Sequence, residues 1–202
     1  MKLFYPAVSG FLKIYFRLFY QLKVYGLENL PDGAAILAPN HASFFDPPVI
    51  AASCKEEVSF LARASLFRHF LFGSLISKLN AHPVTGTAQD LASIKLICNL
   101  LKENKKVVVF PEGIRTEDGE LGEIKPGIGM LSLRANAPIV PVFIKGTYEV
   151  WSKDKKWPKP WGHISCTFGK AIYPQEFSML GKKEAQEALA EAVKNSLSII
   201  AS

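Results

Sequence analysis

The chain has 202 residues, 49% of them apolar, which is enough for one compact domain with a sizeable core. Its net charge of +6 fits an anionic partner, but it has no run of five or more Lys and Arg, which argues against a nucleic-acid-binding tail. Cys54, Cys98 and Cys166 lie far apart and form no CxxC pair, which argues against a disulfide framework or a structural zinc site and favours a reducing compartment.

The first 24 residues are expected to form an amphipathic helix that lies in a membrane interface. Residues 3–24 are apolar and aromatic, and Lys13, Arg17 and Gln21 interrupt them at a spacing that places all three along one stripe of a helix. A helix crossing the bilayer would bury two cations at ~3 kcal/mol each, whereas an interfacial helix leaves them among lipid headgroups. The alternative is a helix that docks its apolar face on the protein's own core.

From residue 34 onward, apolar strand-like runs alternate with helical patterns. The predicted strands are 34–38, 58–61, 82–84, 106–110, 139–144 and 164–168, and the predicted helices are 47–53, 66–79, 88–104, 127–135 and 182–200. This alternation is typical of an α/β fold, with a mostly parallel or mixed sheet flanked by helices. Pro138 and Pro141 bracket one of the runs, which predicts an edge or irregular strand there. No linker divides residues 25–202.

A His and an Asp follow the first predicted strand, in the segment Asn40-His41-Ala42-Ser43-Phe44-Phe45-Asp46. In an extended chain they would lie ~17 Å apart, and positions i and i+5 do not share a helix face. A turn before a helix starting at Asp46-Pro47 would bring Asp46 back to His41. Asp46 could then fix the imidazole tautomer and leave the other ring nitrogen as a general base. The alternative is that Asp46 only caps the helix and His41 is a turn residue.

A second polar segment, Phe110-Pro111-Glu112-Gly113-Ile114-Arg115-Thr116, follows the strand predicted at 106–110. Arg115 can bind phosphate through two parallel hydrogen bonds, and Glu112 can hold Arg115 or bind a substrate hydroxyl. Gly113 permits an unusual backbone angle or a close ligand approach. Because open α/β sheets bind ligands beyond the carboxyl ends of their strands, both segments could face one crevice. The alternative is a surface turn with a solvated Glu–Arg pair.

Two further segments are candidates for contact with anions or lipid. Lys125-Pro126-Gly127 opens a predicted helix and is either an anion site or a plain helix start. Residues 151–161 hold all three tryptophans of the chain, interleaved with four lysines. This composition suits a membrane interface, although single-stranded nucleic acid or a solvated loop with rings packed in the core are alternatives. The apolar N-terminal segment favours the membrane.

In their order and spacing, three groups of residues resemble the glycerolipid acyltransferase family, and small bacterial-type lysophosphatidic acid acyltransferases above all. They are His41-x4-Asp46, then Phe110-Pro111-Glu112-Gly113 with Arg115, then Pro138-Ile139-Val140-Pro141. The similarity runs from about Leu30 to Gly169.

The resemblance implies roles for six residues. His41 would deprotonate the lysolipid hydroxyl while Asp46 orients the imidazole. Glu112, Gly113 and Arg115 would bind the glycerol phosphate, and Lys125 is similar to the family's basic residue beyond that loop. The implied catalytic residues are thus His41 and Asp46, and the implied substrate-binding residues are Glu112, Gly113, Arg115 and Lys125.

The implied reaction moves a fatty acyl group from an acyl thioester, either acyl-CoA or acyl carrier protein, directly to the sn-2 hydroxyl of lysophosphatidic acid, giving phosphatidic acid. It needs no cofactor, no metal and no acyl-enzyme intermediate. Residues 25–202 would be the catalytic domain, and residues 1–24 would hold it on the cytoplasmic face of the inner membrane. The expected partners are the two substrates and the membrane surface, and no nucleic acid.

One position departs from the family pattern. An Arg usually closes the family's second block, whereas here the strand around His82 ends in Thr85-Gly86. Arg115, Lys125 or His82 could compensate, or the acceptor head group could differ. The alternative functions are acyl transfer to another lysolipid, noncatalytic lipid binding with a purely structural His–Asp pair, and metal-dependent hydrolysis. The lack of further clustered ligand residues argues against the last.

Overall fold

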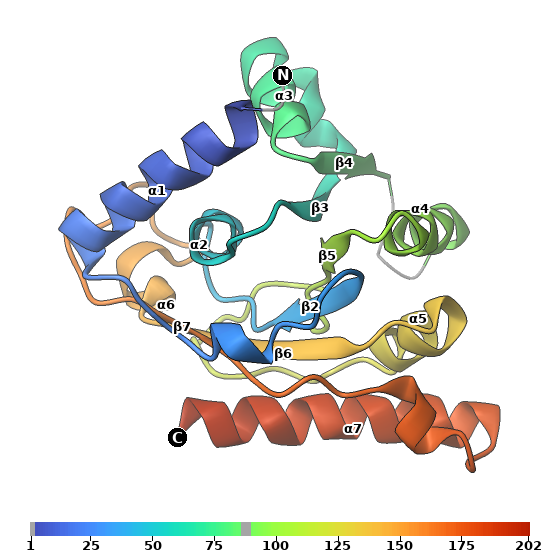
Figure 1. Ribbon diagram of the computed structural model, residues 1–202. Helices are drawn as coiled ribbons and strands as arrows, with labels where there is room; N and C mark the ends of the chain where they lie inside the picture. The colour runs from blue at the N-terminus through green and yellow to red at the C-terminus, as the bar shows by residue number, and fades with distance from the viewer. Residues whose placement is uncertain (1–2, 86–89) are drawn as a thin grey trace.

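The computed structural model describes residues 3–85 and 90–202, and its centre is a seven-stranded sheet with helices on both faces (Figure 1). The strands are β1 (Lys23–Tyr25), β2 (Ala35–Pro39), β3 (Val58–Arg63), β4 (Ala81–Val84), β5 (Lys106–Val108), β6 (Ile139–Lys145) and β7 (Ser165–Phe168). Their spatial order is β1-β7-β6-β2-β5-β3-β4, and every neighbouring pair is parallel except β6 with β7. The predicted α/β fold with a mostly parallel, mixed sheet is confirmed.

Two groups of helices cover the two faces of this sheet (Figure 1). The helices are α1 (Phe4–Tyr20), α2 (Asp46–Ser53), α3 (Phe70–Lys78), α4 (Leu91–Lys102), α5 (Gly127–Ala135), α6 (Thr147–Trp151) and α7 (Lys182–Ala201), with short 3-10 turns η1 (Leu27–Asn29), η2 (Ala64–Arg68) and η3 (Pro174–Phe177). Alternate residues of β2 serve the two groups: Leu37 packs with α1 and α2, whereas Ile36 packs with α4, α5 and α7. Burial on both faces explains why the strands read as continuous apolar runs.

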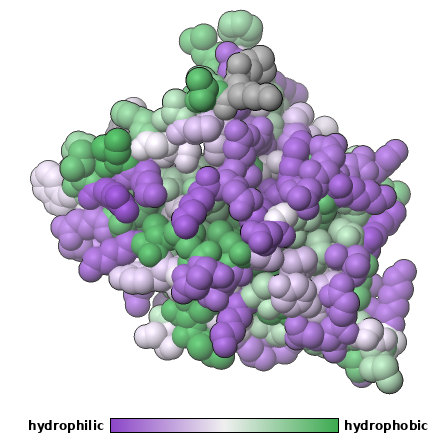
Figure 2. Space-filling view, in the orientation of Figure 1, coloured by the Kyte–Doolittle hydropathy of each residue, from purple (hydrophilic) through white to green (hydrophobic). Residues whose placement is uncertain are grey.

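The N-terminal helix α1 carries apolar side chains on its inner face and also on its outer face. Its inner face buries Phe16 and Tyr20, whose rings contact Phe45 in the core. Its outer face leaves a row of large apolar side chains exposed, namely Phe11, Ile14 and Leu18. Figure 2 shows apolar surface over α1 and over α3. The docked-helix interpretation thus holds for the inner side of α1, and the interfacial one stays a prediction for its outer side.

The polar stripe predicted on α1 is shorter than the sequence spacing indicated. Lys13 and Arg17 lie on the helix, but Gln21 follows its last residue in a left-handed conformation, with φ of 48°. Among residues 3–85 and 90–202, none of the helices has both the length and the apolar character needed to cross a membrane.

The edge position predicted for the proline-bracketed strand is wrong, because β6 lies between β2 and β7 in the middle of the sheet. Pro141 is tolerated there because its missing N–H would point toward β7, which has already ended. The last β6–β7 pair is Val142 with Phe168, and the Pro141 carbonyl accepts a hydrogen bond from the amide of Gly169.

One strand and one helix lie outside the predicted set. These are the edge strand β1, which has only three residues, and α6, a single short helix after β6. The helix predicted at 66–79 also divides into η2 and α3, since His69 between them has extended backbone angles. Both missed elements are too short to show a periodic pattern in the sequence.

Candidate active site

The predicted turn between His41 and Asp46 brings the two side chains into direct contact at the carboxyl end of β2. His41 Nδ1 lies 2.8 Å from Asp46 Oδ2, and Asp46 is fully buried while the His41 side chain is 19% exposed. Asp46 is the first residue of α2, and Phe45 occupies the cap position without a side-chain hydrogen bond. The contact therefore leaves His41 Nε2 as the ring nitrogen available to a substrate.

The Asp46 carboxylate receives hydrogen bonds on both oxygens. Besides His41, Oδ2 accepts from the backbone amides of Ala42 at 2.8 Å and Ser43 at 2.7 Å. Oδ1 accepts from the hydroxyl of Thr147, also at 2.7 Å. The two amides and the hydroxyl donate to the carboxylate, and His41 Nδ1 does so in the tautomer that carries its proton on that nitrogen. Asp46 thus does more than cap α2, because its contacts fold the preceding turn around His41.

The second polar segment packs directly on the first, as the shared-crevice interpretation predicted. The His41 ring stacks on Phe110 with a centroid distance of 3.9 Å. The Thr116 amide donates to the His41 carbonyl at 2.8 Å, and Glu112 Oε1 accepts from the His41 amide at 2.7 Å. The order of strands explains this meeting, because β2 and β5 are parallel neighbours and both segments follow their carboxyl ends.

Glu112 is buried and uses both of its oxygens to bind backbone. While Oε1 accepts from His41, Oε2 accepts from the amide of Gly122 at 3.0 Å. Burial raises the pKa of Glu112, the two backbone hydrogen bonds oppose that rise, and the nearby charge of Asp46 adds to it. Among the described residues Glu112 forms no ion pair with Arg115, and its contacts join the His41–Asp46 turn to the loop at Gly122.

Arg115 is half-buried, and an aromatic ring positions its guanidinium. The guanidinium carbon lies 3.8 Å from the ring centroid of Phe44, which belongs to the turn between His41 and Asp46. Burial lowers the pKa of Arg115, the neighbouring positive charge of Arg63 lowers it further, and Asp46 opposes the change. Arg63 is therefore a second cation near the site.

Arg63 was not among the residues predicted for the site. It is the exposed last residue of β3, so its side chain starts at the carboxyl edge of the sheet, where the other site residues lie. The available signal was its position just after the strand predicted at 58–61, the same placement that singled out His41 and Glu112.

Gly113 and Lys125 lie together. Gly113 has φ of +77°, and a Cβ at this residue would stand 3.1 Å from Lys125 Nζ. The Lys125 amide donates to the carbonyl of Pro111 at 3.1 Å, which anchors the chain just before α5. A side chain at position 113 would thus strain the backbone and crowd the ammonium, so glycine keeps this approach open.

The remaining candidates contribute less. His82 lies half-buried in β4, where burial lowers its pKa and Lys105 lowers it further. Thr85 is exposed, and Gly86 lies outside the described residues. Within residues 3–85 and 90–202, no three His, Cys, Asp or Glu side chains gather as a metal ion would need.

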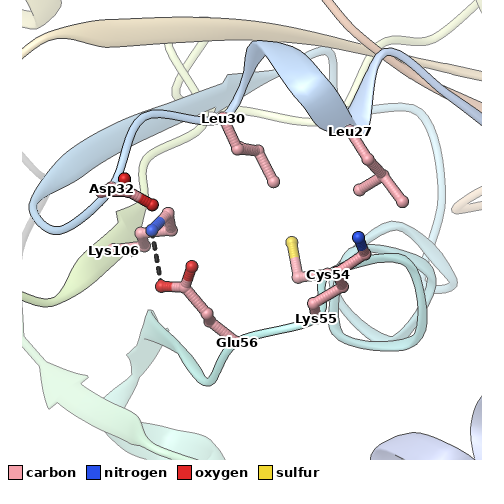
Figure 3. A pocket seen from close by; sticks show the side chains of 7 residues that line it. All are labelled: Leu27, Leu30, Asp32, Cys54, Lys55, Glu56 and Lys106. Carbon is pink, nitrogen blue, oxygen red and sulfur yellow. Dashed lines mark hydrogen bonds and ion pairs between the residues drawn. The ribbon is translucent and has the colours of Figure 1, made fainter.

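A cavity of about 170 Å³ lies away from this site, at the amino ends of the strands (Figure 3). The ammonium of Lys106, the first residue of β5, is bound there by Glu56 at 2.6 Å and by the carbonyl of Gly33 at 3.0 Å. The Cys54 thiol also lines the cavity, and burial raises its pKa. Because the Lys106 ammonium is already bound and the Cys54 thiol is kept neutral, we assign this cavity a structural role and no chemistry.

Comparison with known proteins shows that this chain is similar to acyltransferases. Residues 21–145 match the family model described as "Acyltransferase". The 1-acyl-sn-glycerol-3-phosphate acyltransferase of Bacillus subtilis is 29% identical over 191 residues, which cover 94% of this chain and 92% of that protein. The chloroplastic 1-acyl-sn-glycerol-3-phosphate acyltransferase LPAT1 of Arabidopsis thaliana is 27% identical over 179 residues, 87% of this chain, and this alignment spans only half of the plant protein.

A solved acyltransferase structure is also similar to this chain. The crystal structure of the 1-acyl-sn-glycerophosphate (LPA) acyltransferase PlsC from Thermotoga maritima superposes with a TM-score of 0.81 at 26% identity. The match covers 98% of this chain and 80% of that one. The similarity thus extends across the whole sheet and its helices as well as the two polar segments.

Proposed function

The chain belongs to the acyltransferase family, and we propose that it transfers a fatty acyl group from an acyl thioester to the sn-2 hydroxyl of lysophosphatidic acid, giving phosphatidic acid. The observation that carries this proposal is the His41–Asp46 contact of 2.8 Å beside the cation Arg115. A general base next to an anion-binding group is what an acceptor with one hydroxyl and one phosphate requires.

In the proposed reaction His41 acts as the base through Nε2. As Nε2 takes the proton of the acceptor hydroxyl, the oxygen attacks the thioester carbonyl, and Asp46 stabilises the imidazolium that forms. The tetrahedral intermediate then collapses with loss of the thiolate, which recovers the proton from His41. The ester bond forms as the C–S bond breaks, and no acyl group is attached to the protein.

The acceptor phosphate would be bound by the cations around the base. Arg115 offers a planar pair of donors in a half-buried position, and Phe44 holds that plane in place. Arg63, whose charge acts on Arg115, and Lys125, whose ammonium lies by Gly113, would add positive charge in place of the Arg that the family's second block usually has. Glu112 would contribute by holding the His41 backbone, and Gly113 by leaving room for the phosphate.

The site would act at the surface of a lipid bilayer on its cytoplasmic side. The apolar outer row of α1 supports this, as do Trp157 and Trp161, which are 72% and 74% exposed in a lysine-rich loop. Trp151 differs from the other two tryptophans, because its ring packs on Phe44 and Phe45. The interfacial segment predicted at 1–24 would thus bind lipid with its outer face only, as a peripheral helix.

A substrate panel tests the proposed function. The purified protein is given labelled acyl-CoA or labelled acyl carrier protein together with lysophosphatidic acid or an uncharged-headgroup lysolipid. We expect phosphatidic acid from lysophosphatidic acid with at least one donor, unaffected by a chelator. Transfer only to other lysolipids would reassign the acceptor. Binding of lipid without transfer would identify a noncatalytic lipid-binding protein, and loss of activity on chelation would indicate metal-dependent chemistry.

A further inference from the structure

Thr147 makes a buried contact with the catalytic pair that the proposed mechanism does not use. Its hydroxyl donates to Asp46 Oδ1 at 2.7 Å, on the oxygen opposite to the one that His41 contacts. Both Thr147 and Asp46 are fully buried, so no water can replace this donor. The carboxylate is therefore held at two points, by three donors on Oδ2 and by one on Oδ1.

Contacts from Asn40 and from His163 fix the position of the chain just before Thr147. Just beyond the paired part of β2, the Asn40 side chain forms two hydrogen bonds with Ile144, accepting from its amide at 2.7 Å and donating to its carbonyl at 3.0 Å. The chain then turns at Gly146, whose φ is +89° and where a Cβ would collide with the carbonyl of His163. This turn begins α6 and directs Thr147 onto Asp46.

A second contact ties α6 to the same turn. The hydroxyl of Ser43 donates to the carbonyl of Trp151, the last residue of α6, at 2.7 Å. The turn from His41 to Asp46 is thus fixed on one side by Glu112 and on the other by α6. Among the described residues, Thr147 gives the one contact to Oδ1, so it supports the rotation of the Asp46 carboxylate from the side that the Oδ2 contacts leave open.

We propose that Thr147 is a positioning residue for acyl transfer, which holds the Asp46 carboxylate in the plane that orients His41. This inference rests on the proposed function. Without the hydroxyl, Oδ1 becomes a buried acceptor with no other donor among the described residues, and the carboxylate gains freedom to rotate away from Nδ1. The imidazole then loses its fixed orientation, which acts on turnover and leaves substrate binding largely intact.

The test compares Thr147→Val, which keeps the shape and removes the hydroxyl, with Thr147→Ser, which keeps the hydroxyl. We expect kcat of Thr147→Val to fall about 10- to 100-fold, as for loss of one hydrogen bond to a charged group, with KM for lysophosphatidic acid nearly unchanged. Thr147→Ser should stay close to wild type. In proton NMR with labelled histidine, the Nδ1–H signal of the His41–Asp46 bond should persist in Thr147→Ser and broaden or shift in Thr147→Val.

The control is Ser132→Ala on α5, which removes a hydroxyl that is equally buried and donates to the Ala137 carbonyl at 2.7 Å. It should lower stability and leave kcat unchanged. If the Thr147→Val substitution prevents folding, Thr147→Ala gives the same comparison. A Thr147→Val kcat within twofold of wild type, or an equal loss in Ser132→Ala, overturns the inference. Wild-type protein that transfers no acyl group to lysophosphatidic acid would instead overturn the proposed function.

Discussion

Glu112 accepts a hydrogen bond from the backbone amide of His41 at 2.7 Å, so the segment after β5 holds the residue that follows β2. The two polar segments thus act as one unit, in which Asp46 fixes the imidazole ring and Glu112 fixes the backbone that carries it. The Glu112 carboxyl is buried to achieve this, and its other oxygen holds Gly122. A substitution at Glu112 should therefore change the position of His41 as well as that of the loop at Gly122.

The burial of Glu112 predicts a pH-dependent cost in stability. Burial raises the pKa of Glu112 above its ordinary value of 4.5. An acid with a raised folded-state pKa contributes most to stability below its unfolded pKa, and this contribution is lost as the pH rises through the folded-state value. Glu112→Gln cannot titrate there. The stability of the wild type relative to this variant should therefore decline between about pH 4 and neutral pH, as measured by urea unfolding.

Glu191→Gln on α7 is the matched control, because its side chain is exposed. It should show no such decline relative to the wild type. A wild-type advantage over Glu112→Gln that grows from acid to neutral pH would contradict the assignment of burial as the main effect on Glu112.

Arg115 should determine acceptor affinity. Arg115→Ala should weaken binding of lysophosphatidic acid by roughly 2–4 kcal/mol, because a charge-assisted contact is lost in a sheltered site. Arg115→Lys should not restore it, since a point charge reproduces neither the paired donors nor the stacking on Phe44. Steady-state kinetics with each substrate varied would show a raised KM for the acceptor and little change for the donor.

The control for Arg115 is Arg134→Ala, an exposed arginine at the end of α5. It removes the same charge from the chain without touching the site, so it should leave both KM values unchanged. A normal acceptor KM in Arg115→Ala would favour the surface-turn interpretation of the segment after β5.

The outer row of α1 should bind the protein to lipid. Replacing Phe11, Ile14 and Leu18 by Ser should weaken binding to vesicles at least about tenfold, because each fully buried apolar side chain contributes ~1.5–3 kcal/mol. Lys13→Glu with Arg17→Glu should weaken binding to anionic vesicles only, and high salt should weaken wild-type binding in part. Vesicle co-sedimentation measures all three effects.

Ile199→Ser with Met179→Ser is the matched control, since both side chains are large, apolar and exposed but lie on or before α7, on the opposite face of the sheet from α1. These changes should leave vesicle binding intact. Sidedness is tested by labelling a tag placed before Met1 in sealed vesicles. A tag reached only from the side opposite the catalytic domain would contradict a peripheral helix.

The elements that the sequence predicted well are those with a strong period or a long apolar run. The helix at 127–135 has the predicted bounds, and the strands around Leu37 and Val108 lie where their apolar residues indicated. The edge assignment of Pro141 failed because a missing N–H matters only where a partner strand continues, and β7 ends at Phe168. That relationship between distant segments leaves no local signal.

Some residues of the site could likewise be predicted from the sequence, and others could not. His41 and Asp46 are close in the sequence, so their contact could be predicted from a turn, and Arg115 could be placed beside them from the position of its strand. Thr147 and Arg63 reach the site from elements far along the chain, and α6 has only five residues. Their roles depend on the order of strands in the sheet, which neither periodicity nor spacing determines.

The turnover of His41→Ala tests the central claim most directly. His163→Ala, which changes an exposed histidine outside the site, is its matched control. We expect kcat of His41→Ala to fall roughly 10²–10⁴-fold with binding of lysophosphatidic acid largely kept, because general-base help is lost and the described residues place no second base at the pair. His163→Ala should remain fully active. A His41→Ala enzyme that keeps more than about a tenth of the wild-type rate would contradict the assignment of His41 as the base.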